Sequence, residues 1–144
     1  MQTVAQPSID AHVLRTAISR CRLAVEDHRA ELTQLDAVLG DGAHGDNLVI
    51  GFRAVELHIA ELPPETRPGE LLRAVGHRLV AAVGGASGPL YGTAFIEAGF
   101  AAAGVDWIYT AFDVAPGDAG AALDAMRVLG FGGLSVTMPH KEAV

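Results

Sequence analysis

Apolar residues recur at the spacing of a helical face over residues 8–104. The first run places them at i, i+4, i+7 and i+11 and continues to a glycine-rich stop, with members Leu14, Ile18, Cys21, Val25, Leu32, Leu35 and Val38. This spacing is typical of one face of an α-helix. Further helices are expected from about Asp46 or Asn47, from about Glu70 and from Pro89, which suits a first helical turn. The expected inward faces of the second and third helices are Leu48, Phe52, Val55, Ile59 and Leu72, Val75, Leu79, Val83. The pattern predicts about four helices.

The pattern changes after Gly104. Residues 107–112 are rich in aromatic and β-branched side chains, which favours a β-strand. A short helix is expected to end at Gly130, and residues 133–137 again have the composition of a strand. The chain is therefore expected to be mainly α-helical, with a short β-α-β tail.

Two glycine-rich segments separate the predicted helices and carry the candidate chemistry. Residues 40–46 place Asp41 and Asp46 beside glycines, and Asp36 precedes them. Tight turns at glycines can bring such carboxylates together, and Mg²⁺ prefers oxygen ligands of this kind. Residues 84–88 precede another helix, whose free backbone N–H groups can bind an anion. The simpler interpretation, capping and turn residues without a ligand, stays open at this point.

The composition narrows the possible functions. Ten basic residues stand against 17 acidic ones, a net charge of −7, so the chain lacks the basic surface that a nucleic-acid binder needs. Cys21 is the single cysteine, which excludes an intramolecular disulfide. Neither a membrane-spanning apolar run of about 18 residues nor a secretory signal is recognisable. We expect a soluble, cytoplasmic protein that contacts neither nucleic acid nor membrane.

Residues 35–47 and 84–93 closely resemble two motifs of the nucleotide-binding L subunit of dihydroxyacetone kinases, and the resemblance extends over about residues 8–97. It implies an antiparallel helical barrel, incomplete in this chain, that holds ADP or ATP through two Mg²⁺ ions. It also implies a partner, the K subunit, which holds dihydroxyacetone covalently on a histidine. We accordingly expect residues 1–97 to form a helical half-domain of this kind.

The same resemblance assigns roles to individual residues. Asp36 and Asp41 match the first two of three metal-binding aspartates, and the third position is occupied by Ala43, which has no ligand atom. Asp46 is a candidate for partial compensation. The residues expected at the nucleotide phosphates are His44, Gly45, Asp46 and Asn47 in the first loop and Gly85, Ala86, Ser87 and Gly88 in the second.

A second resemblance covers about residues 98–144. Residues from about Ala98 onward, up to and including the run at 133–141, are similar to part of the substrate-binding domain of shikimate dehydrogenases. It implies that Thr137 and Lys141 contact shikimate and that Lys141 is catalytic. The NADP-binding domain of that family has no counterpart here, and without a cofactor site no hydride can be transferred. An ordinary exposed lysine is the simpler interpretation of Lys141.

Three functions remain as alternatives. The first is an L-subunit-like binder of Mg–ADP or Mg–ATP for phosphoryl transfer to dihydroxyacetone, impaired by the missing aspartate and by the absence of the family's second half. The second is a substrate-binding fragment of a shikimate dehydrogenase. The third is a non-catalytic helical scaffold that forms homo-oligomers through unpaired apolar faces. The two resemblances meet in the helix at residues 94–100, so the chain is interpreted as a hybrid, or chimera, of two families.

Overall fold

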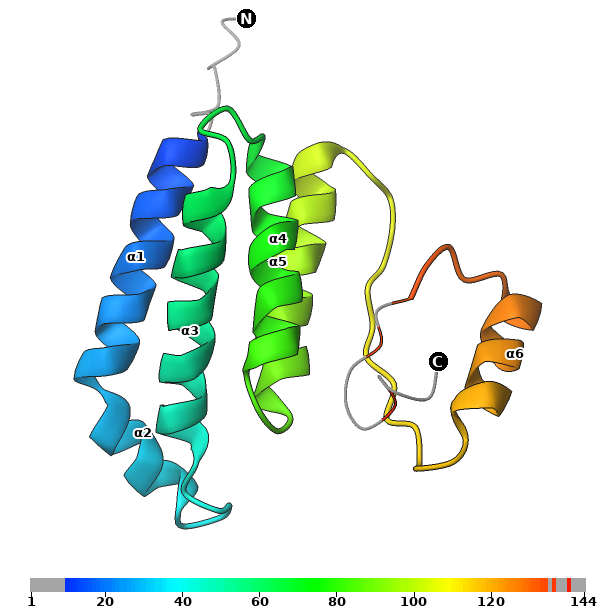
Figure 1. Ribbon diagram of the computed structural model, residues 1–144, viewed down its shortest axis with the longest axis horizontal. Coiled ribbons are helices and arrows are strands. Elements are labelled where there is room, and N and C mark those ends of the chain that lie inside the picture. The colour runs from blue at the N-terminus through cyan, green and yellow to red at the C-terminus, as the bar shows by residue number, and fades with distance from the viewer. Residues whose placement is uncertain (1–9, 135, 137–139, 141–144) are drawn as a thin grey trace, which may run out of the picture. The chain divides into compact units, whose positions relative to one another are not determined.

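The computed structural model describes residues 10–134, 136 and 140, and within them six α-helices and no β-strand. The helices are α1 (Ala11–Asp27), α2 (Arg29–Asp36), α3 (His44–Glu61), α4 (Pro68–Ala82), α5 (Ser87–Ala103) and α6 (Ala119–Leu129) (Figure 1). The chain divides into two compact units, Met1–Tyr109 with α1 to α5 and Thr110–Val144 with α6. The expectation of a mainly helical protein is confirmed.

The long helices of the first unit pack as a row, in which α3 contacts α1 and α4, and α4 contacts α5. Successive helices of the row alternate in direction (Figure 1). α1 and α5 form the two edges of the row, so these helices make an open antiparallel bundle. A closed barrel is not formed by the part of the chain that the structure describes.

One predicted helix is two helices in the structure. The first apolar run predicts a continuous helix, whereas the chain interrupts it at His28, between α1 and α2. His28 has φ −99° and ψ 10°, and its ring atom Nδ1 lies 2.9 Å from the Ala24 carbonyl oxygen, which the His28 backbone N–H also reaches. A side chain bonded to nearby backbone offers an alternative to regular helix geometry. The break lets α2 pack against α3, beside the candidate site.

The core of the first unit lies where α1, α3 and α4 face one another. Its buried side chains are Ile18, Leu48, Phe52, Val55, Ile59, Leu71, Val75, Leu79 and Val83. The predicted inward face of α3 is confirmed in full. On α4, Val75 and Leu79 are buried as predicted, but Leu71 is buried in place of Leu72. The buried stripe runs at i, i+4 and i+8 from Leu71 through Val75 to Leu79.

Glycines let α4 and α5 touch backbone to backbone. A Cβ on Gly76 of α4 would lie 2.6 Å from the carbonyl oxygen of Gly92 on α5, and one on Gly92 would lie 2.7 Å from that of Gly76. Gly69 and Gly99 face each other in the same way, with both separations 2.8 Å. Real Cβ atoms do not approach a carbonyl oxygen so closely, so these positions require glycine. The two helices form a tight antiparallel hairpin.

The first strand of the predicted β-α-β tail, residues 107–112, is not formed. Trp107 packs edge-on against Phe100 of α5 with ring centroids 5.8 Å apart, and the Tyr109 backbone N–H donates to the Glu97 carboxylate. A strand needs a partner for its backbone groups, and these residues contact the side chains of α5 instead. Aromatic and β-branched composition alone therefore gave the wrong element.

The helix of the predicted tail is confirmed as α6, which ends at Gly130 with φ +72°. The second predicted strand spans residues 133–137, of which 133, 134 and 136 are described and have no strand geometry. Residues 135 and 137 lie outside the described part. Within the second unit, Phe112 packs edge-on against Phe131 at 5.8 Å between ring centroids. None of the described helices is long and apolar enough to cross a membrane.

Candidate functional site

The segment between α2 and α3 folds back onto the side chain of Asp36. The Asp36 Oδ2 atom accepts the backbone N–H of Ala43 at 3.0 Å and that of His44 at 3.2 Å. The Asp41 Oδ1 atom accepts the same Ala43 N–H at 3.0 Å, and Gly42 makes this turn possible with a left-handed φ of +70°. Both oxygens lie 3.0 Å from the Ala43 nitrogen, so the two oxygens are separated by no more than twice this distance. The structure brings the two predicted metal-ligating carboxylates together.

The second glycine-rich segment lies against the first turn of α3. A Cβ on Gly84 would lie 3.2 Å from the side-chain amide atoms of Asn47. The Ser87 hydroxyl lies 3.0 Å from the His44 Nδ1 atom, a hydrogen bond between residues 43 positions apart. The Tyr91 ring lies beside that of His44, with centroids 6.4 Å apart. The two loops therefore form one site, which His44 connects to Asp36 through its backbone and to Ser87 through its ring.

Two helices begin at this site, α3 at His44 and α5 at Ser87. The first turn of a helix presents backbone N–H groups without partners in the helix, and the helix dipole makes that end favourable for an anion. Neither N-cap residue, Ala43 or Ala86, makes a side-chain capping bond. At α3 the His44 N–H already donates to Asp36, so an anion between the two helix ends would rely on the N–H groups that follow it.

α2 packs closely against the first turn of α3. A Cβ on Gly45 would collide with the Arg29 carbonyl oxygen and would lie 2.5 Å from the Thr33 hydroxyl, so Gly45 is required for this approach. The Arg29 side chain forms an ion pair with the Asp46 carboxylate. The guanidinium group of Arg29, through this hydrogen bond and its charge, lowers the pKa of Asp46. Asp46 is thus an ionised carboxylate engaged by an arginine.

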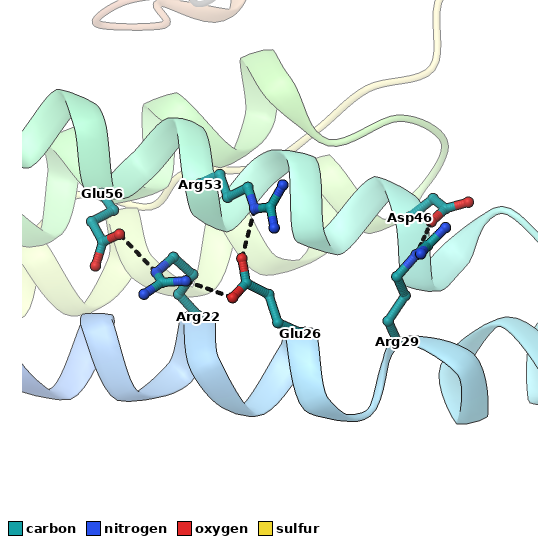
Figure 2. Close-up of polar contacts among 6 residues, drawn as sticks. All are labelled: Arg22, Glu26, Arg29, Asp46, Arg53 and Glu56. Carbon is teal, nitrogen blue, oxygen red and sulfur yellow. Dashed lines mark hydrogen bonds and ion pairs between the residues drawn. The ribbon is translucent and has the colours of Figure 1, made fainter.

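The Arg29–Asp46 pair lies at one end of a row of ion pairs along α1, α2 and α3 (Figure 2). In the rest of the row, Arg22 contacts Glu26 at 2.6 Å and Glu56 at 2.7 Å, and Arg53 contacts Glu26 at 2.6 Å. Hydrogen bonds from Arg53 and Arg22 lower the pKa of Glu26. Three of these four pairs link α1 or α2 to α3, the helix whose first turn carries the site.

The family model of the DAK2 domain matches residues 38–130 of this chain. This match covers more than half of the sequence and includes both loops of the site. The chain belongs to the DAK2 domain family.

Curated relatives of this DAK2 chain include dihydroxyacetone kinase subunits. The "PEP-dependent dihydroxyacetone kinase 2, ADP-binding subunit DhaL" of Listeria innocua is 47% identical over 78 residues, which are 52% of this chain and 35% of the relative. The "PEP-dependent dihydroxyacetone kinase, ADP-binding subunit DhaL" of Escherichia coli is 40% identical over 83 residues, 56% of this chain and 38% of the relative. The chain thus spans little more than a third of the length of these relatives.

A separate segment is similar to another kind of protein. A "Shikimate dehydrogenase (NADP(+))" from Moorella thermoacetica is 56% identical over 48 residues, 33% of this chain and 16% of the relative. The chain therefore shares sequence with two kinds of protein, although the DAK2 model covers the larger part.

The donor atoms of this DAK2 chain fit one magnesium ion better than two. Asp36 and Asp41 offer two carboxylates, Ala43 offers none, and Asp46 is engaged by Arg29. Among the described residues, no three acidic, histidine or cysteine side chains form a group that could hold a metal. Mg²⁺ is commonly bound by one or two carboxylates together with phosphate oxygens and water. The pair suits one Mg²⁺ shared with a phosphate ligand, and the three-aspartate arrangement is not available.

The predicted phosphate residues differ in their surroundings. The His44 ring contacts Ser87, Asn47 lies against Gly84, and Gly85 and Ala86 are exposed in the second loop. Gly88 is buried, and a Cβ there would lie 2.5 Å from the Val83 carbonyl oxygen, so packing explains this glycine. Thr137 and Lys141 lie outside the described residues.

Sequence reasoning missed two neighbours of the DAK2 site. Tyr91 lies one helical turn after Ser87 inside the recognised motif, so its place beside His44 could have been inferred from i, i+4 spacing. Arg29 has no such signal, because its approach to Asp46 depends on the break at His28.

Proposed function

We propose that this chain binds ADP or ATP together with Mg²⁺, as a nucleotide-binding module of the kind found in dihydroxyacetone kinases. The observation that carries the proposal is the junction of the two loops, where the His44 ring bonds to Ser87 and the His44 backbone bonds to Asp36. It is supported by the DAK2 match and by relatives whose names describe ADP-binding subunits.

Each part of the junction has a proposed role. Asp36 and Asp41 hold the ion, which neutralises charge on the nucleotide phosphates when bound. In the first loop, the first turn of α3 contacts phosphate through His44, Gly45 and Asn47. In the second loop, the residues proposed to enclose phosphate are Gly85, Ala86, Ser87 and Gly88. Helix ends and a positioned hydroxyl bind an anion without requiring a basic surface, which agrees with the acidic net charge.

The proposed reaction is phosphoryl transfer to dihydroxyacetone held by a K-type partner subunit. The relatives are named as subunits of such kinases, and this chain spans little more than a third of their length. Phosphoryl transfer depends mainly on positioning and charge neutralisation. Because Ala43 removes one carboxylate from the site, we propose that nucleotide binding is retained and that transfer is strongly impaired.

Isothermal titration calorimetry with ADP, with and without Mg²⁺, tests the binding proposal. Heat is expected with Mg²⁺ and little or none with EDTA. Asp36→Asn should remove the Mg²⁺-dependent heat, because it removes one of two ligating carboxylates. Asp124→Asn on α6 makes the same charge change at an exposed ion pair with Arg127 and should leave binding unchanged. No Mg²⁺-dependent binding of the wild-type chain at millimolar ADP would reject the proposal.

The likeness to shikimate dehydrogenase supports a second candidate function. We propose that the chain is a hybrid whose last segment, about residues 98–144, derives from the substrate-binding part of such an enzyme, with Thr137 and Lys141 as the residues toward shikimate. The support is the 48-residue similarity. Calorimetry with shikimate tests it: binding that Lys141→Ala abolishes favours this candidate, and no binding at millimolar shikimate removes it.

A further inference from the structure

The first turn of α3 places Asp46 where an acidic side chain can reach back over the helix start. α3 begins at His44 with Ala43 as its N-cap residue, so Asp46 is the third residue of the helix. A side chain at this third position lies within one turn of the helix start, so a carboxylate there is close to the loop that precedes the helix. An Asp46 side chain that is not held by a partner can therefore turn toward the loop at residues 40–43.

The Ala43 N–H group is the point where Asp36 and Asp41 converge, each at 3.0 Å. An Asp46 carboxylate turned toward this loop would thus lie near both of these carboxylates. Three carboxylates in one place repel each other and attract a divalent cation more strongly than two. Such a set would restore the number of acidic ligands that the alanine at position 43 reduces.

The structure shows Asp46 held elsewhere, by Arg29 on the neighbouring helix (Figure 2). Arg29 is the first residue of α2, and the close approach at Gly45 leaves no space between the Arg29 backbone and α3. The Arg29 side chain therefore begins directly beside Asp46. Its charge also keeps the Asp46 carboxylate ionised, which maintains the pair.

We propose that Arg29 is a positioning residue that withholds the Asp46 carboxylate from the metal-binding loop, so that Asp36 and Asp41 alone hold a single divalent cation. The inference deepens the proposed metal–nucleotide function and rests on it. It assigns to α2 a control over how many acidic ligands the site presents.

A double-mutant cycle with Mn²⁺ alone, read by electron paramagnetic resonance, tests the inference. Arg29→Gln should raise Mn²⁺ affinity by about tenfold, the low end of what residues that orient metal ligands contribute. Asp46→Asn should change affinity less than about twofold in the wild-type background and should remove the whole gain in the Arg29→Gln background. Arg29→Lys, which keeps the charge beside Asp46, should behave as the wild type does.

Arg53→Gln is the matched control, because it removes an arginine of similar exposure, 64% against 59%, from another ion pair on the same row. Its Mn²⁺ affinity should equal that of the wild type. Equal effects of Asp46→Asn in both backgrounds would show that only net charge matters and would overturn the inference. Binding of two Mn²⁺ ions by the wild type in the presence of ADP would overturn it as well.

The two proposals fail in different ways. Absence of Mg²⁺-dependent ADP binding by the wild type rejects the nucleotide function, whereas the cycle in Mn²⁺ alone requires no nucleotide. Circular dichroism of every variant establishes that the helices are intact. A gain in Mn²⁺ affinity that depends on Asp46, without ADP binding by the wild type, supports the role of Arg29 and rejects the nucleotide proposal.

Discussion

Ala43 is the residue on which the chemistry of the site depends most. Its backbone N–H donates to both Asp36 and Asp41, while its methyl side chain occupies the place where the resemblance implies a third aspartate. The backbone at this position therefore organises two carboxylates, and its side chain contributes no ligand. A single substitution can change the ligand set without changing the loop.

Ala43→Asp should raise the affinity for Mg²⁺–ADP by about tenfold or more, because it adds a carboxylate beside two others and also supplies a favourable N-cap residue. Calorimetry at fixed Mg²⁺ measures the change. Ala121→Asp provides the control, since it adds the same charge to the exposed first turn of α6 in the second unit. Equal affinity of wild type and Ala43→Asp would indicate that the loop is a structural turn.

At the scale of elements, the sequence correctly predicts those features that depend only on the spacing of nearby residues. The apolar stripe of α3 and the stop at Gly130 follow from periodicity and a left-handed residue, and both are confirmed. The break at His28 coincides with a contact between its ring and the Ala24 carbonyl oxygen, which the apolar spacing does not predict. The strand expected at residues 107–112 depends on a partner that periodicity cannot supply.

At the candidate site, too, residues within a motif can be predicted from the sequence, whereas contacts between helices cannot. Asp36, Asp41, His44 and Ser87 could be named from two motifs, and the structure brings them together. The engagement of Asp46 by Arg29 depends on how α2 packs against α3. Such a contact between helices has no signature in a single sequence.

The α4–α5 hairpin yields a prediction of stability. Gly76→Ala should lower the free energy of unfolding by about 1–3 kcal/mol or more, because the added methyl group meets the Gly92 carbonyl oxygen at 2.6 Å. Urea denaturation followed by circular dichroism measures the loss. Gly120→Ala in α6 is the contrasting control, since nothing lies within 4 Å of its added methyl group and alanine favours a helix. A Gly76→Ala variant as stable as the wild type would contradict the backbone contact.

At the scale of the whole molecule, the chain is two units joined by a segment without helix or strand. The site belongs entirely to the first unit, between Asp36 and Tyr91, whereas the DAK2 match continues to residue 130 and so enters the second. Large apolar side chains are exposed in both units, including Leu57 and Leu90 in the first and Val128 and Leu129 in the second. Analytical ultracentrifugation over a range of concentrations tests the scaffold alternative, which requires self-association without ligand binding.

Brief digestion with chymotrypsin should cut first between α5 and α6. Phe112 is 64% exposed and lies outside any helix, whereas Leu57 is 72% exposed but lies within α3. A protease needs a locally extended chain, so exposure inside a helix does not suffice. Intact-mass analysis should show a fragment that contains α1 to α5, and that fragment should bind Mg²⁺–ADP as the whole chain does. First cleavage inside α3 would contradict this division.

The backbone contact between α4 and α5 has a consequence for how the site responds to a ligand. One wall of the site, the second loop, is the tip of a hairpin whose halves interlock through glycines and cannot slide past each other without steric overlap. The other wall is carried by α2, which has no fully buried residue and is held by the approach at Gly45, by the partly buried Leu32 packed against the core, and by an exposed ion pair. The stiffness of the two walls is therefore unequal. Under the proposed function, a bound nucleotide would meet the fixed second loop, and adjustment to its size would come from displacement of α2.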